Sequence, residues 1–543
     1  MTTGTMTEEK TAQQVLLGDE AVALGAVHAG ISAAYAYPGT PSTEILEYLI
    51  QHMERKGGPK AAWCANEKTA TEEALGVSMV GRRSIVAMKH VGLNVAADPF
   101  MNAAIVSIHG GLVVAVADDP GMHSSQNEQD SRYFADFARV ICLEPANQQE
   151  AYDMTREAFD LSERFKIPVL IRLVTRLAHS RAVVTTHPAR AENPVSKAAN
   201  PAGWILLPGN ARRQWRALLD RQPEIRAVAE ASRWNALSLE EKDRDLGIIT
   251  TGIARNYYME NVKDLPSRPS HLHIGTYPVP HEKIRALARH VKRILIVEEG
   301  YPFVERYLRG ILPAPLEIRG KESGALPPDG ELTPDIVRAA LGLPPKSGVE
   351  IEGLKLPNRP PQLCPGCGHA DAYTALKKAL SGFDRSLVTS DIGCYTLGAL
   401  PPYSAIESCV CMGASVSMAK GAAEAGFYPA VAVIGDSTFL HSGVTPLMDA
   451  VSSNADMTVI ILDNEVVAMT GTQPTILPSS QLRDVALGIG VDPDHCHLVE
   501  AHPKKVDEMA ALIRKEIDHH GLSVVIVQRE CLESARKSKP RAK

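Results

Sequence analysis

The sequence lacks the features that mark membrane proteins, secreted proteins and nucleic-acid-binding proteins. No apolar run reaches the roughly 18 residues that a membrane-spanning helix requires. Met1–Lys10 has neither the basic nor the apolar region of a signal peptide. The formal net charge of −6 offers no basic surface for nucleic acid. We therefore expect a cytoplasmic protein without a membrane span and without a nucleic-acid partner.

Cysteine is scarce as well, and its pattern excludes a disulfide framework. The nine cysteines are an odd number and are not regularly spaced. Together with the missing signal peptide, this pattern indicates a reducing compartment. Metal or cluster binding then explains a closely spaced pair better than a disulfide does. Five cysteines are interpreted as small apolar residues: Cys64, Cys142, Cys409, Cys411 and Cys496.

What is present is the composition of a globular α/β protein. Hydrophobic residues make up 45% of the 543 and charged residues 22%, which excludes a disordered chain. The length suggests about three domains. Helical and strand patterns alternate over residues 1–184, which predicts a doubly wound domain with a mostly parallel sheet. Residues 185–245 are expected to be a linker with local helices, followed by a smaller α/β domain at 246–345 and a last domain at 346–543.

Two apolar runs in the last domain carry oxygen-bearing side chains at their ends. Asp436 follows the first run and Asn464, 28 residues further on, follows the second. Buried parallel strands present their carboxyl ends at one edge of a sheet, where open α/β sheets bind ligands. A carboxylate and an amide suit Mg²⁺ or Ca²⁺, and Mg²⁺ usually shares its coordination with phosphates. The pair therefore favours a metal-bridged diphosphate, although two ordinary polar residues at strand ends produce the same pattern.

The first domain offers three candidate positions. The turn Tyr37–Thr43 leads into a helix whose free N–H groups suit a carboxylate or phosphate, unless it is simply a capped helix start. Glu67 is either catalytic or a first-turn glutamate favoured by the helix dipole. Arg132 ends a long polar loop that begins at Asp118, and it either pairs with a substrate carboxylate or lies at the surface.

The last domain contains four cysteines with ligand-type placement. Cys364 and Cys367 form a C-x-x-C turn that brings both thiolates to one face. Cys394 lies 27 residues further on, and Cys531 follows the expected strand Leu522–Gln528. Four thiolates suit an iron–sulfur cluster or tetrahedral zinc, and the ligand count does not separate the two. Reduced, unligated thiols are a third alternative.

Several segments, in order along the chain, resemble the 2-oxoacid:ferredoxin oxidoreductases. Gly435–Ser437 with Asn464 resembles the Gly-Asp-Gly…Asn signature of thiamine diphosphate enzymes, and Ala468–Gln473 resembles the segment that follows it in this family. Three further segments look like the large subunit of indolepyruvate ferredoxin oxidoreductase: Leu363–His369, Asp391–Gly398 and Cys411–Gly413. The resemblance implies two doubly wound thiamine-diphosphate-binding-type domains with a smaller transketolase-C-terminal-like α/β domain, residues 246–345, between them.

The resemblance also implies cofactors and the residues that bind them. Thiamine diphosphate would be activated by Glu67, and the 2-oxoacid carboxylate would meet Thr40. Activation needs a carboxyl group because its hydrogen bond to the pyrimidine N1′ drives the tautomer that accepts the C2 proton. The diphosphate would be held through Mg²⁺ bound by Asp436, Asn464 and the backbone carbonyl of Val466. Further cofactor contacts are expected at Tyr37, Gly39, Lys89, Asn94, Gly368, His369, Gly393, Met412, Gly413, Gly435, Ser437, Thr438, Met469 and Thr470.

A redox cofactor and a reaction follow from the same resemblance. In this family four cysteines in this order bind a [4Fe–4S] cluster beside the thiamine, which implies Cys364, Cys367, Cys394 and Cys531 as its ligands. The implied reaction is oxidative decarboxylation of an aryl 2-oxoacid, such as indolepyruvate or phenylpyruvate, with transfer of the acyl group to coenzyme A. The implied partners are a small (beta) subunit and ferredoxin or another electron carrier.

The sequence departs from the family in one respect. The family's large subunit commonly continues into a ferredoxin module with repeated C-x-x-C-x-x-C runs, and none occurs before Lys543. We therefore expect electrons to leave through a partner protein. The runner-up is a thiamine-dependent decarboxylase that releases an aldehyde without a cluster, and a non-catalytic scaffold subunit is a third alternative. The sequence neither ranks the 2-oxoacids nor identifies the electron acceptor.

Overall fold

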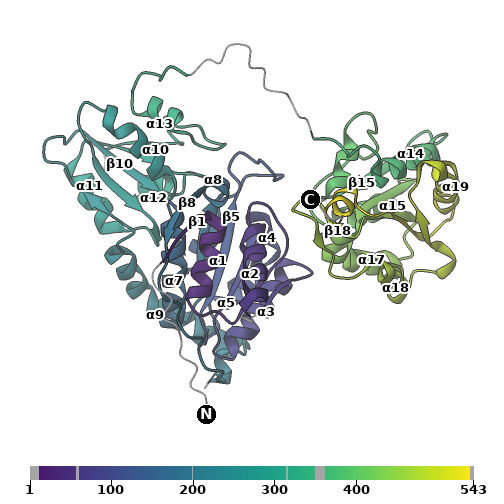
Figure 1. Cartoon of the computed structure of the whole chain (residues 1–543), viewed down its shortest axis with the longest axis horizontal. Helices are drawn as coiled ribbons and strands as arrows, with labels where there is room; N and C mark the ends of the chain where they lie inside the picture. The colour runs from purple at the N-terminus through teal and green to yellow at the C-terminus, as the bar shows by residue number, and fades with distance from the viewer. Residues whose placement is uncertain (1–11, 57–59, 199, 313–315, 349–360, 539–543) are drawn as a thin grey trace. The chain divides into compact units, whose positions relative to one another are not determined.

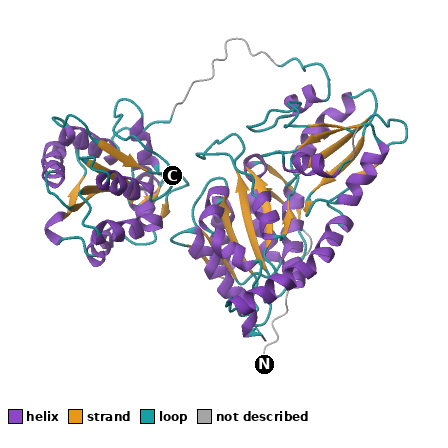
Figure 2. Ribbon diagram, turned by 180° about the vertical axis from the view of Figure 1, so that it is seen from behind, coloured by secondary structure: helices purple, strands orange, loops and turns teal. Residues whose placement is uncertain are grey.

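The computed structural model describes residues 12–56, 60–198, 200–312, 316–348 and 361–538. The chain divides into two compact units, Met1–Glu350 and Ile351–Lys543 (Figure 1). Each unit is built from parallel strands covered by helices, which confirms the predicted α/β fold class (Figure 2). The boundaries predicted within the first unit stay predictions.

The first unit is built on a seven-stranded sheet with the strand order β12-β6-β7-β5-β4-β2-β3. All neighbouring strands are parallel except β12 and β6. Every residue of β2, β4, β5 and β7 is buried because helices cover both faces of the sheet. The strands are β2 (Ala33–Ala36), β3 (Lys60–Trp63), β4 (Ser84–Lys89), β5 (Leu112–Asp118), β6 (Ile141–Leu143), β7 (Val169–Val174) and β12 (Thr276–Tyr277).

Eight helices and one short strand pair surround this sheet in the described residues before 190. The antiparallel pair consists of β1 (Gln13–Leu17) and β8 (Arg181–Thr185). The helices are α1 (Gly18–His28), α2 (Thr43–Lys56), α3 (Glu67–Met79), α4 (His90–Val95), α5 (Ala97–Ala103), α6 (Arg132–Ala138), α7 (Gln148–Phe165) and α8 (Thr175–His179).

A second, smaller sheet in the same unit has the order β14-β13-β10-β11-β9. The segment before it, predicted as a linker with local helices, contains one long helix, α9 (Pro208–Ala231). One strand of this region, β12, pairs with β6 of the larger sheet, so the two sheets belong to one unit. The remaining elements are β9 (Leu237–Ser238), β10 (Leu246–Thr251), β11 (Ser270–Ile274), β13 (Arg293–Val297), β14 (Glu317–Arg319), α10 (Ala254–Asn261), α11 (His281–His290), α12 (Phe303–Ile311) and α13 (Pro334–Ala340).

The second unit has a fully parallel sheet with the order β15-β16-β17-β21-β20. Successive residues of a strand point to opposite faces. In β16, accordingly, Val431 and Val433 join one hydrophobic core and Ala432 and Ile434 join the other. The strands are β15 (Leu387–Ser390), β16 (Ala430–Gly435), β17 (Met457–Asp463), β20 (Cys496–Glu500) and β21 (Leu522–Gln528).

Helices cover both faces of this second sheet. A small hairpin, β18 (Val466–Val467) with β19 (Gln473–Pro474), follows β17. The helices are α14 (Gly368–Leu380), α15 (Ala414–Glu424), α16 (Asp436–Thr438), α17 (Val444–Ser452), α18 (Leu482–Ile489), α19 (Val506–Ile517) and α20 (Leu532–Ser538).

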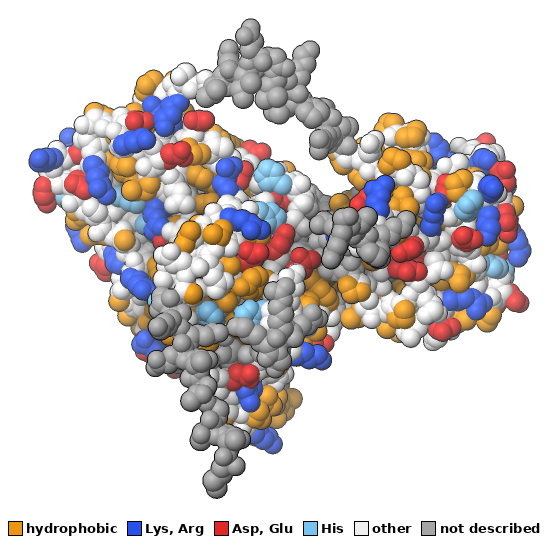
Figure 3. All heavy atoms as spheres, in the orientation of Figure 1, with side chains coloured by type: hydrophobic (Ala, Val, Ile, Leu, Met, Phe, Trp, Pro, Cys, Tyr) orange, Lys and Arg blue, Asp and Glu red, His pale blue; other side chains and the backbone are white. Residues whose placement is uncertain are grey.

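The surface of each unit carries charges of both signs. Figure 3 shows Lys and Arg side chains interspersed with Asp and Glu on the visible face of each unit. Among the described residues, no helix combines the length and the apolar character that crossing a membrane requires.

Candidate functional site

The predicted ligands of the second unit lie at one edge of its sheet. Because all five strands are parallel, their carboxyl ends share that edge. Asp436 follows β16, Asn464 follows β17, and Cys531 lies three residues after β21. The strand register sets Gly435 beside Leu462 and Asp463 beside Gln528. Residues separated by nearly a hundred positions in the sequence are thereby brought to adjacent strand ends.

Asp436 is buried and holds the loop that follows β17. Its Oδ2 accepts hydrogen bonds from the backbone N–H of Asn464 at 3.2 Å and of Glu465 at 2.7 Å. Its Oδ1 accepts from Ser437 N–H at 2.7 Å. Asn464 Oδ1 in turn accepts from Val466 N–H at 3.2 Å. The structure therefore brings all three predicted magnesium ligands into one hydrogen-bonded loop.

Sequence reasoning missed Asp463, the last residue of β17. Its Oδ1 accepts hydrogen bonds from Ser479 Oγ at 2.6 Å and from Glu465 N–H at 3.2 Å. Its Oδ2 is buried and has no hydrogen-bond partner among the described residues. Burial, and then the nearby Asp463 carboxylate, raise the pKa of Asp436 well above its usual value. An acidic residue directly before Asn464 was the signal available in the sequence.

A second carboxylate, Asp391, fixes the loop after β15. Its Oδ2 accepts from Ser415 Oγ at 2.7 Å and from Gly413 N–H at 3.1 Å, and its Oδ1 accepts from the Tyr395 hydroxyl. Burial raises the pKa of Asp391 to about 6. Gly413 has a φ of +87°, and a Cβ there would lie 2.4 Å from the Ser442 carbonyl oxygen, so only glycine fits. Asp391 thus holds the predicted Gly413 loop against the sheet.

The Tyr395 ring explains two of the predicted glycines. A Cβ at Gly393 would lie 2.2 Å from the ring and one at Gly435 would lie 2.5 Å from it. Thr438 Oγ1 donates to the Ile392 carbonyl at 2.9 Å. The loops after β15 and β16 are therefore packed together without room for larger side chains.

The four predicted cysteines line one cavity of about 130 Å³. Cys364 and Cys367 lie in a turn closed by a hydrogen bond from Cys367 N–H to the Cys364 carbonyl at 3.0 Å. Cys531 N–H donates to the Asn464 carbonyl at 3.2 Å. The Asn464 side-chain amide donates to Cys394 Sγ at 3.7 Å. Asn464 thus belongs to the loop of Asp436 and also contacts two of the cysteines.

Two thiols of the cysteine cavity lie in surroundings that favour their neutral form. Burial, and then the proximity of the other cysteines, raise the pKa of Cys367 and Cys394. His369 is buried beside them, with Nδ1 3.5 Å from Cys394 Sγ, and burial lowers its pKa to about 4. His369 Nε2 is buried without a hydrogen-bond partner among the described residues. Gly368 packs closely on Arg529, where a Cβ would lie 2.8 Å from the arginine Cβ.

The spacing of the four sulfurs is wider than a single ion requires. In the described residues, no three of these sulfurs lie within 4.8 Å of one another. A tetrahedral zinc ion bound at about 2.3 Å holds its sulfurs within about 4 Å of each other. A four-iron cluster holds them further apart because each thiolate binds a different iron.

In the first unit, the predicted turn, Lys89 and the polar loop lie together. Gly39 N–H donates to Thr43 Oγ1 at 3.0 Å, and Ser124 Oγ of the polar loop donates to the Thr40 carbonyl at 3.1 Å. Lys89 Nζ donates to the Ser124 carbonyl at 3.0 Å. Its stem covers Gly39, where a Cβ would lie 3.2 Å from Lys89 Cδ. Burial lowers the pKa of Lys89 to about 8.

Glu67 is the first residue of α3 and is 5% exposed. The helix begins there because Asn66 Oδ1 accepts from Thr69 N–H at 2.9 Å. The Glu67 side chain lies against α4, since a Cβ at Gly92 would come within 2.5 Å of Glu67 Oε1. Glycine at position 92 therefore leaves the space that this carboxyl group occupies.

Arg132 lies in a different setting from the open substrate contact that we predicted. It is fully buried, and its Nε donates to Asp130 Oδ1 at 2.9 Å. Its Nη1 donates to Glu298 Oε2 at 3.0 Å, and its Nη2 to the Glu299 carbonyl at 3.0 Å. These contacts link α6 to the end of β13. The guanidinium group is directed at protein acceptors, which is the environment of a structural ion pair.

Other predicted contacts are spread over their units. Tyr37 is buried at the start of the turn, whereas Asn94 is exposed on α4. Met469 is exposed at the rim of the cysteine cavity. Thr470 Oγ1 donates to Gln473 Oε1 at 2.6 Å, which closes the β18–β19 hairpin. The roles assigned to these residues stay predictions.

Comparisons with protein families match both units. Residues 24–217 match the family described as pyruvate flavodoxin/ferredoxin oxidoreductase, thiamine diphosphate-binding. Residues 391–527 match the C-terminal thiamine pyrophosphate-binding domain of thiamine pyrophosphate enzymes. The second match begins at Asp391 and ends in β21. It therefore contains the residues after β15, β16 and β17 described above, but not Cys531.

Several curated relatives match almost the whole chain. Indolepyruvate oxidoreductase subunit IorA of Archaeoglobus fulgidus is 38% identical over 95% of this chain and 86% of its own length. The proteins of the same name from Methanothermobacter marburgensis and Pyrococcus abyssi are 38% and 35% identical over 97% and 95% of this chain. They align over 88% and 85% of their own lengths.

Among solved structures, the 2-oxoglutarate:ferredoxin oxidoreductase of Magnetococcus marinus shares the fold. It aligns with a TM-score of 0.50 and 18% identity, over 61% of this chain and 65% of its own.

Proposed function

The chain belongs to the family of indolepyruvate oxidoreductase subunit IorA, and we propose that it decarboxylates an aryl 2-oxoacid oxidatively and passes the electrons to a cluster in its own second unit. The family consists of thiamine-diphosphate-dependent 2-oxoacid oxidoreductases. One observation carries the proposal: four cysteines line a cavity together with Asn464, the residue whose backbone is held by Asp436. A site for electrons and a site for a cofactor diphosphate are thus adjacent.

The residues of the first unit fit the activation of thiamine diphosphate. When bound, this cofactor supplies the carbanion that attacks a 2-oxoacid and takes up the electron pair left by CO₂. Glu67 is a buried carboxyl group with a fixed position against Gly92, which suits a group that exchanges a hydrogen bond with the cofactor pyrimidine. Thr40, in the turn tied to the polar loop by Ser124, is proposed to receive the substrate carboxylate.

The residues of the second unit fit a magnesium-bound diphosphate. Asp436 and Asp463 are two buried carboxylates close enough to raise the pKa of one of them, and a divalent cation relieves that repulsion. Asn464 and the Val466 carbonyl are proposed to complete the protein ligands. All of these are hard oxygen donors, which Mg²⁺ prefers.

The cysteine cavity fits an iron–sulfur cluster better than a zinc ion. Among the described residues no three of its sulfurs meet within 4.8 Å, and Cys364, Cys367, Cys394 and Cys531 supply the four thiolates of a [4Fe–4S] cluster. A bound cluster requires deprotonated thiolates. Its binding energy therefore offsets the effect of burial, which raises the pKa of Cys394.

The names of the relatives support indolepyruvate as substrate and a partner subunit, and the family resemblance extends the proposal to the other reactants and partners. We propose indolepyruvate or phenylpyruvate as substrate, coenzyme A as acyl acceptor, a small (beta) subunit as stable partner, and ferredoxin or another electron carrier as electron acceptor. We do not assign Arg132 to the substrate, because its guanidinium is already paired with buried carboxylates. A cytoplasmic location stays a prediction.

The test is an anaerobic assay of Glu67→Gln with the small subunit present. Indolepyruvate, phenylpyruvate and 2-oxoglutarate are compared for acyl-CoA formation and for reduction of a viologen dye. We expect arylpyruvates to be preferred and Glu67→Gln to lose about 10²- to 10⁴-fold in rate, because a proton-transfer group is removed. Glu72→Gln, on the same helix but exposed, is the matched control and should stay active.

Three outcomes would contradict the proposal. Full activity of Glu67→Gln would remove this residue from catalysis. Aldehyde formation without dye reduction would identify a non-oxidative decarboxylase. Failure to bind thiamine diphosphate, in a chain that still forms a stable complex with the small subunit, would identify a scaffold.

A further inference from the structure

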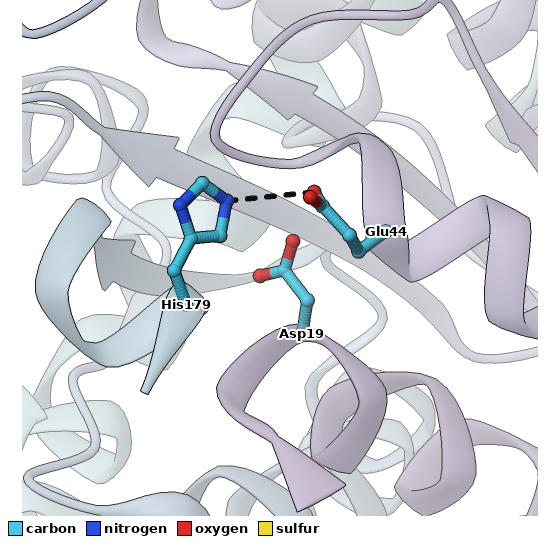
Figure 4. Close-up of side chains that lie close together, drawn as sticks. All are labelled: Asp19, Glu44 and His179. Atoms are coloured by element: carbon cyan, nitrogen blue, oxygen red, sulfur yellow. Dashed lines mark ion pairs between the residues drawn. The ribbon is translucent and has the colours of Figure 1, made fainter. Parts of the chain in front are cut away.

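Three metal-ligand side chains that have no part in the proposed function meet in the first unit. Asp19 and Glu44 lie in the first turns of α1 and α2, and His179 is the last residue of α8. One ligand atom of each lies within 4.8 Å of the others, and among the described residues this is the only such group of three or more. Figure 4 shows the three side chains converging on one point.

The Asp19 side chain is the observation that calls for a ligand. It is 0% exposed, and neither of its oxygens has a hydrogen-bond partner among the described residues. Figure 4 shows its carboxyl group pointing toward Glu44 and His179, which form an ion pair with 3.5 Å between Oε2 and Nε2. A buried carboxylate without partners is strongly unfavourable.

The donor set selects the chemistry of the missing partner. Two carboxylates and an imidazole provide a net negative site with one nitrogen ligand, which repels anions and suits a divalent transition metal. Mg²⁺ prefers oxygen ligands alone. The site can be reached from solvent, because the side chains of Glu44 and His179 are each 35% exposed. We propose that Asp19, Glu44 and His179 bind a divalent cation of the zinc and manganese class.

The backbone holds two of these elements at the distance that the site requires. A Cβ at Gly18 would lie 2.2 Å from the Leu177 carbonyl oxygen, so glycine lets the start of α1 touch α8. The N–H of Leu17, directly before the helix, donates to Glu20 Oε2 at 2.8 Å. Asp19 and His179 are therefore fixed by main-chain packing before a cation binds.

The cation would stabilise the supports of the substrate turn. Glu44 directly follows Thr43, whose Oγ1 accepts from Gly39 N–H at 3.0 Å. At the other end of α8, Thr175 Oγ1 donates to Asp119 Oδ1 at 2.7 Å, and Asp119 Oδ2 accepts from Ser124 N–H at 2.8 Å. The three ligands are therefore positioning residues. This consequence for the turn rests on the proposed function, whereas the metal site itself does not.

The test measures metal content and melting temperature of the full chain, neither of which depends on catalysis. Protein is purified anaerobically, treated with a mild chelator, saturated with Mg²⁺ and thiamine diphosphate, and titrated with Zn²⁺ or Mn²⁺. We expect wild type to bind one more ion per chain than His179→Gln. Loss of the imidazole ligand should weaken the binding of that ion at least about 100-fold. The melting temperature of the first unit should rise on titration in wild type and not in His179→Gln.

His187→Gln is the matched control. His187 also pairs with a carboxylate, Asp153, at 3.2 Å, but it is not part of the three-ligand group. It should keep the wild-type metal content and the wild-type shift. Asp19→Asn provides a second variant, expected to lose the ion and the shift. Equal metal content in wild type, His179→Gln and Asp19→Asn would overturn the proposal, and so would an Asp19→Asn protein that melts higher than metal-saturated wild type.

Discussion

The two units contain parallel sheets of similar build, yet the ion-pair network around Arg132 in the first unit and the strand ends of the second unit treat buried polar groups in opposite ways. Beyond β5 in the first unit, Arg172 Nε donates to Asp118 Oδ2 at 2.6 Å, and Arg132 is enclosed by carboxylates and carbonyls. At the sheet edge of the second unit, Asp463 Oδ2 and His369 Nε2 have no partner among the described residues, and four thiols share a cavity. A buried charge that is paired with other groups of the protein indicates a structural role. Buried polar atoms without partners indicate a site for a ligand.

The difference has an architectural cause. In the first unit the smaller sheet closes over the larger one, and its Glu298 and Glu299 supply acceptors for Arg132. At the carboxyl edge of the second sheet, loops and the starts of α14 and α20 line a cavity that carries ligand-type atoms. The first unit should therefore depend on its ion pairs for stability, and the second should depend on its cofactors for activity.

The largest effect should follow from Cys394→Ser. This change removes one thiolate of the proposed cluster site, so we expect most of the bound iron and at least about 100-fold of the dye-reducing activity to be lost. Iron content and activity of anaerobically purified protein measure both. Cys496→Ala, a buried cysteine of β20 outside the cavity, should retain iron. A fully active, iron-replete Cys394→Ser protein would contradict the cluster assignment.

Asp436→Asn should weaken cofactor binding next. Loss of one negative ligand is expected to lower the affinity for Mg²⁺ and thiamine diphosphate by on the order of 100-fold, while iron stays bound. Isothermal titration calorimetry with both cofactors checks this expectation. Asp449→Asn, an exposed aspartate of α17, is the control. Unchanged affinity in Asp436→Asn would place the diphosphate elsewhere.

Arg132→Met should affect stability and spare the second unit. Removing this guanidinium leaves Glu298 buried without a cationic partner and Asp130 with Arg172 alone, which is expected to cost about 3–5 kcal/mol in the free energy of unfolding of the first unit. Arg164→Met breaks the exposed pair with Glu224 and should cost less than about 1 kcal/mol. Chemical denaturation measures both costs, and iron content should not change. Equal costs for the two variants would remove the contrast between the units.

The smallest effect concerns Lys89, a buried cation in the first unit without a carboxylate hydrogen-bonded to it. Because burial lowers its pKa from 10.5 to about 8, the unfolded chain binds more protons between these pH values. The cost of burial is fully present below about pH 8 and fades as the pH rises toward 10.5. Lys89→Met should therefore gain about 2 kcal/mol of stability at pH 7 and much less at pH 9.5.

Thermal melting at the two pH values measures this difference. Lys68→Met, which removes an exposed lysine of α3, should show no such pH dependence. A gain for Lys89→Met that does not change with pH would contradict the burial of a charged amine.

Features of the fold and the site could be predicted from the sequence where a short stretch of neighbouring residues determines them. Asp436 and Asn464 were predictable as neighbours because each directly follows a buried strand, and parallel strands align their ends. The meeting of Cys531 with Cys364 followed from family resemblance alone, since spacing does not show which loops share a cavity. The burial of Arg132 was not predicted, because a long polar loop gave no sign that the smaller sheet would cover it.

The group of Asp19, Glu44 and His179 shows the same limit. Each is an ordinary helix-terminal residue by sequence, and only the packing of α1 against α2 and α8 brings them together. Asp463, in contrast, was visible beside Asn464 and was missed because a strand-end acid is common. Local sequence patterns thus predicted helices, strands and the polar residues at individual strand ends. Contacts between distant segments could be found only from the structure.

The most direct test of the central claim is a single-turnover EPR experiment. Anaerobic protein loaded with thiamine diphosphate and Mg²⁺, together with its small subunit, is mixed with indolepyruvate and frozen without any external acceptor. The account predicts a reduced-cluster signal that requires the substrate and disappears in both Glu67→Gln and Cys394→Ser. A protein that decarboxylates the substrate while its iron stays oxidised, or that contains no iron, would contradict it.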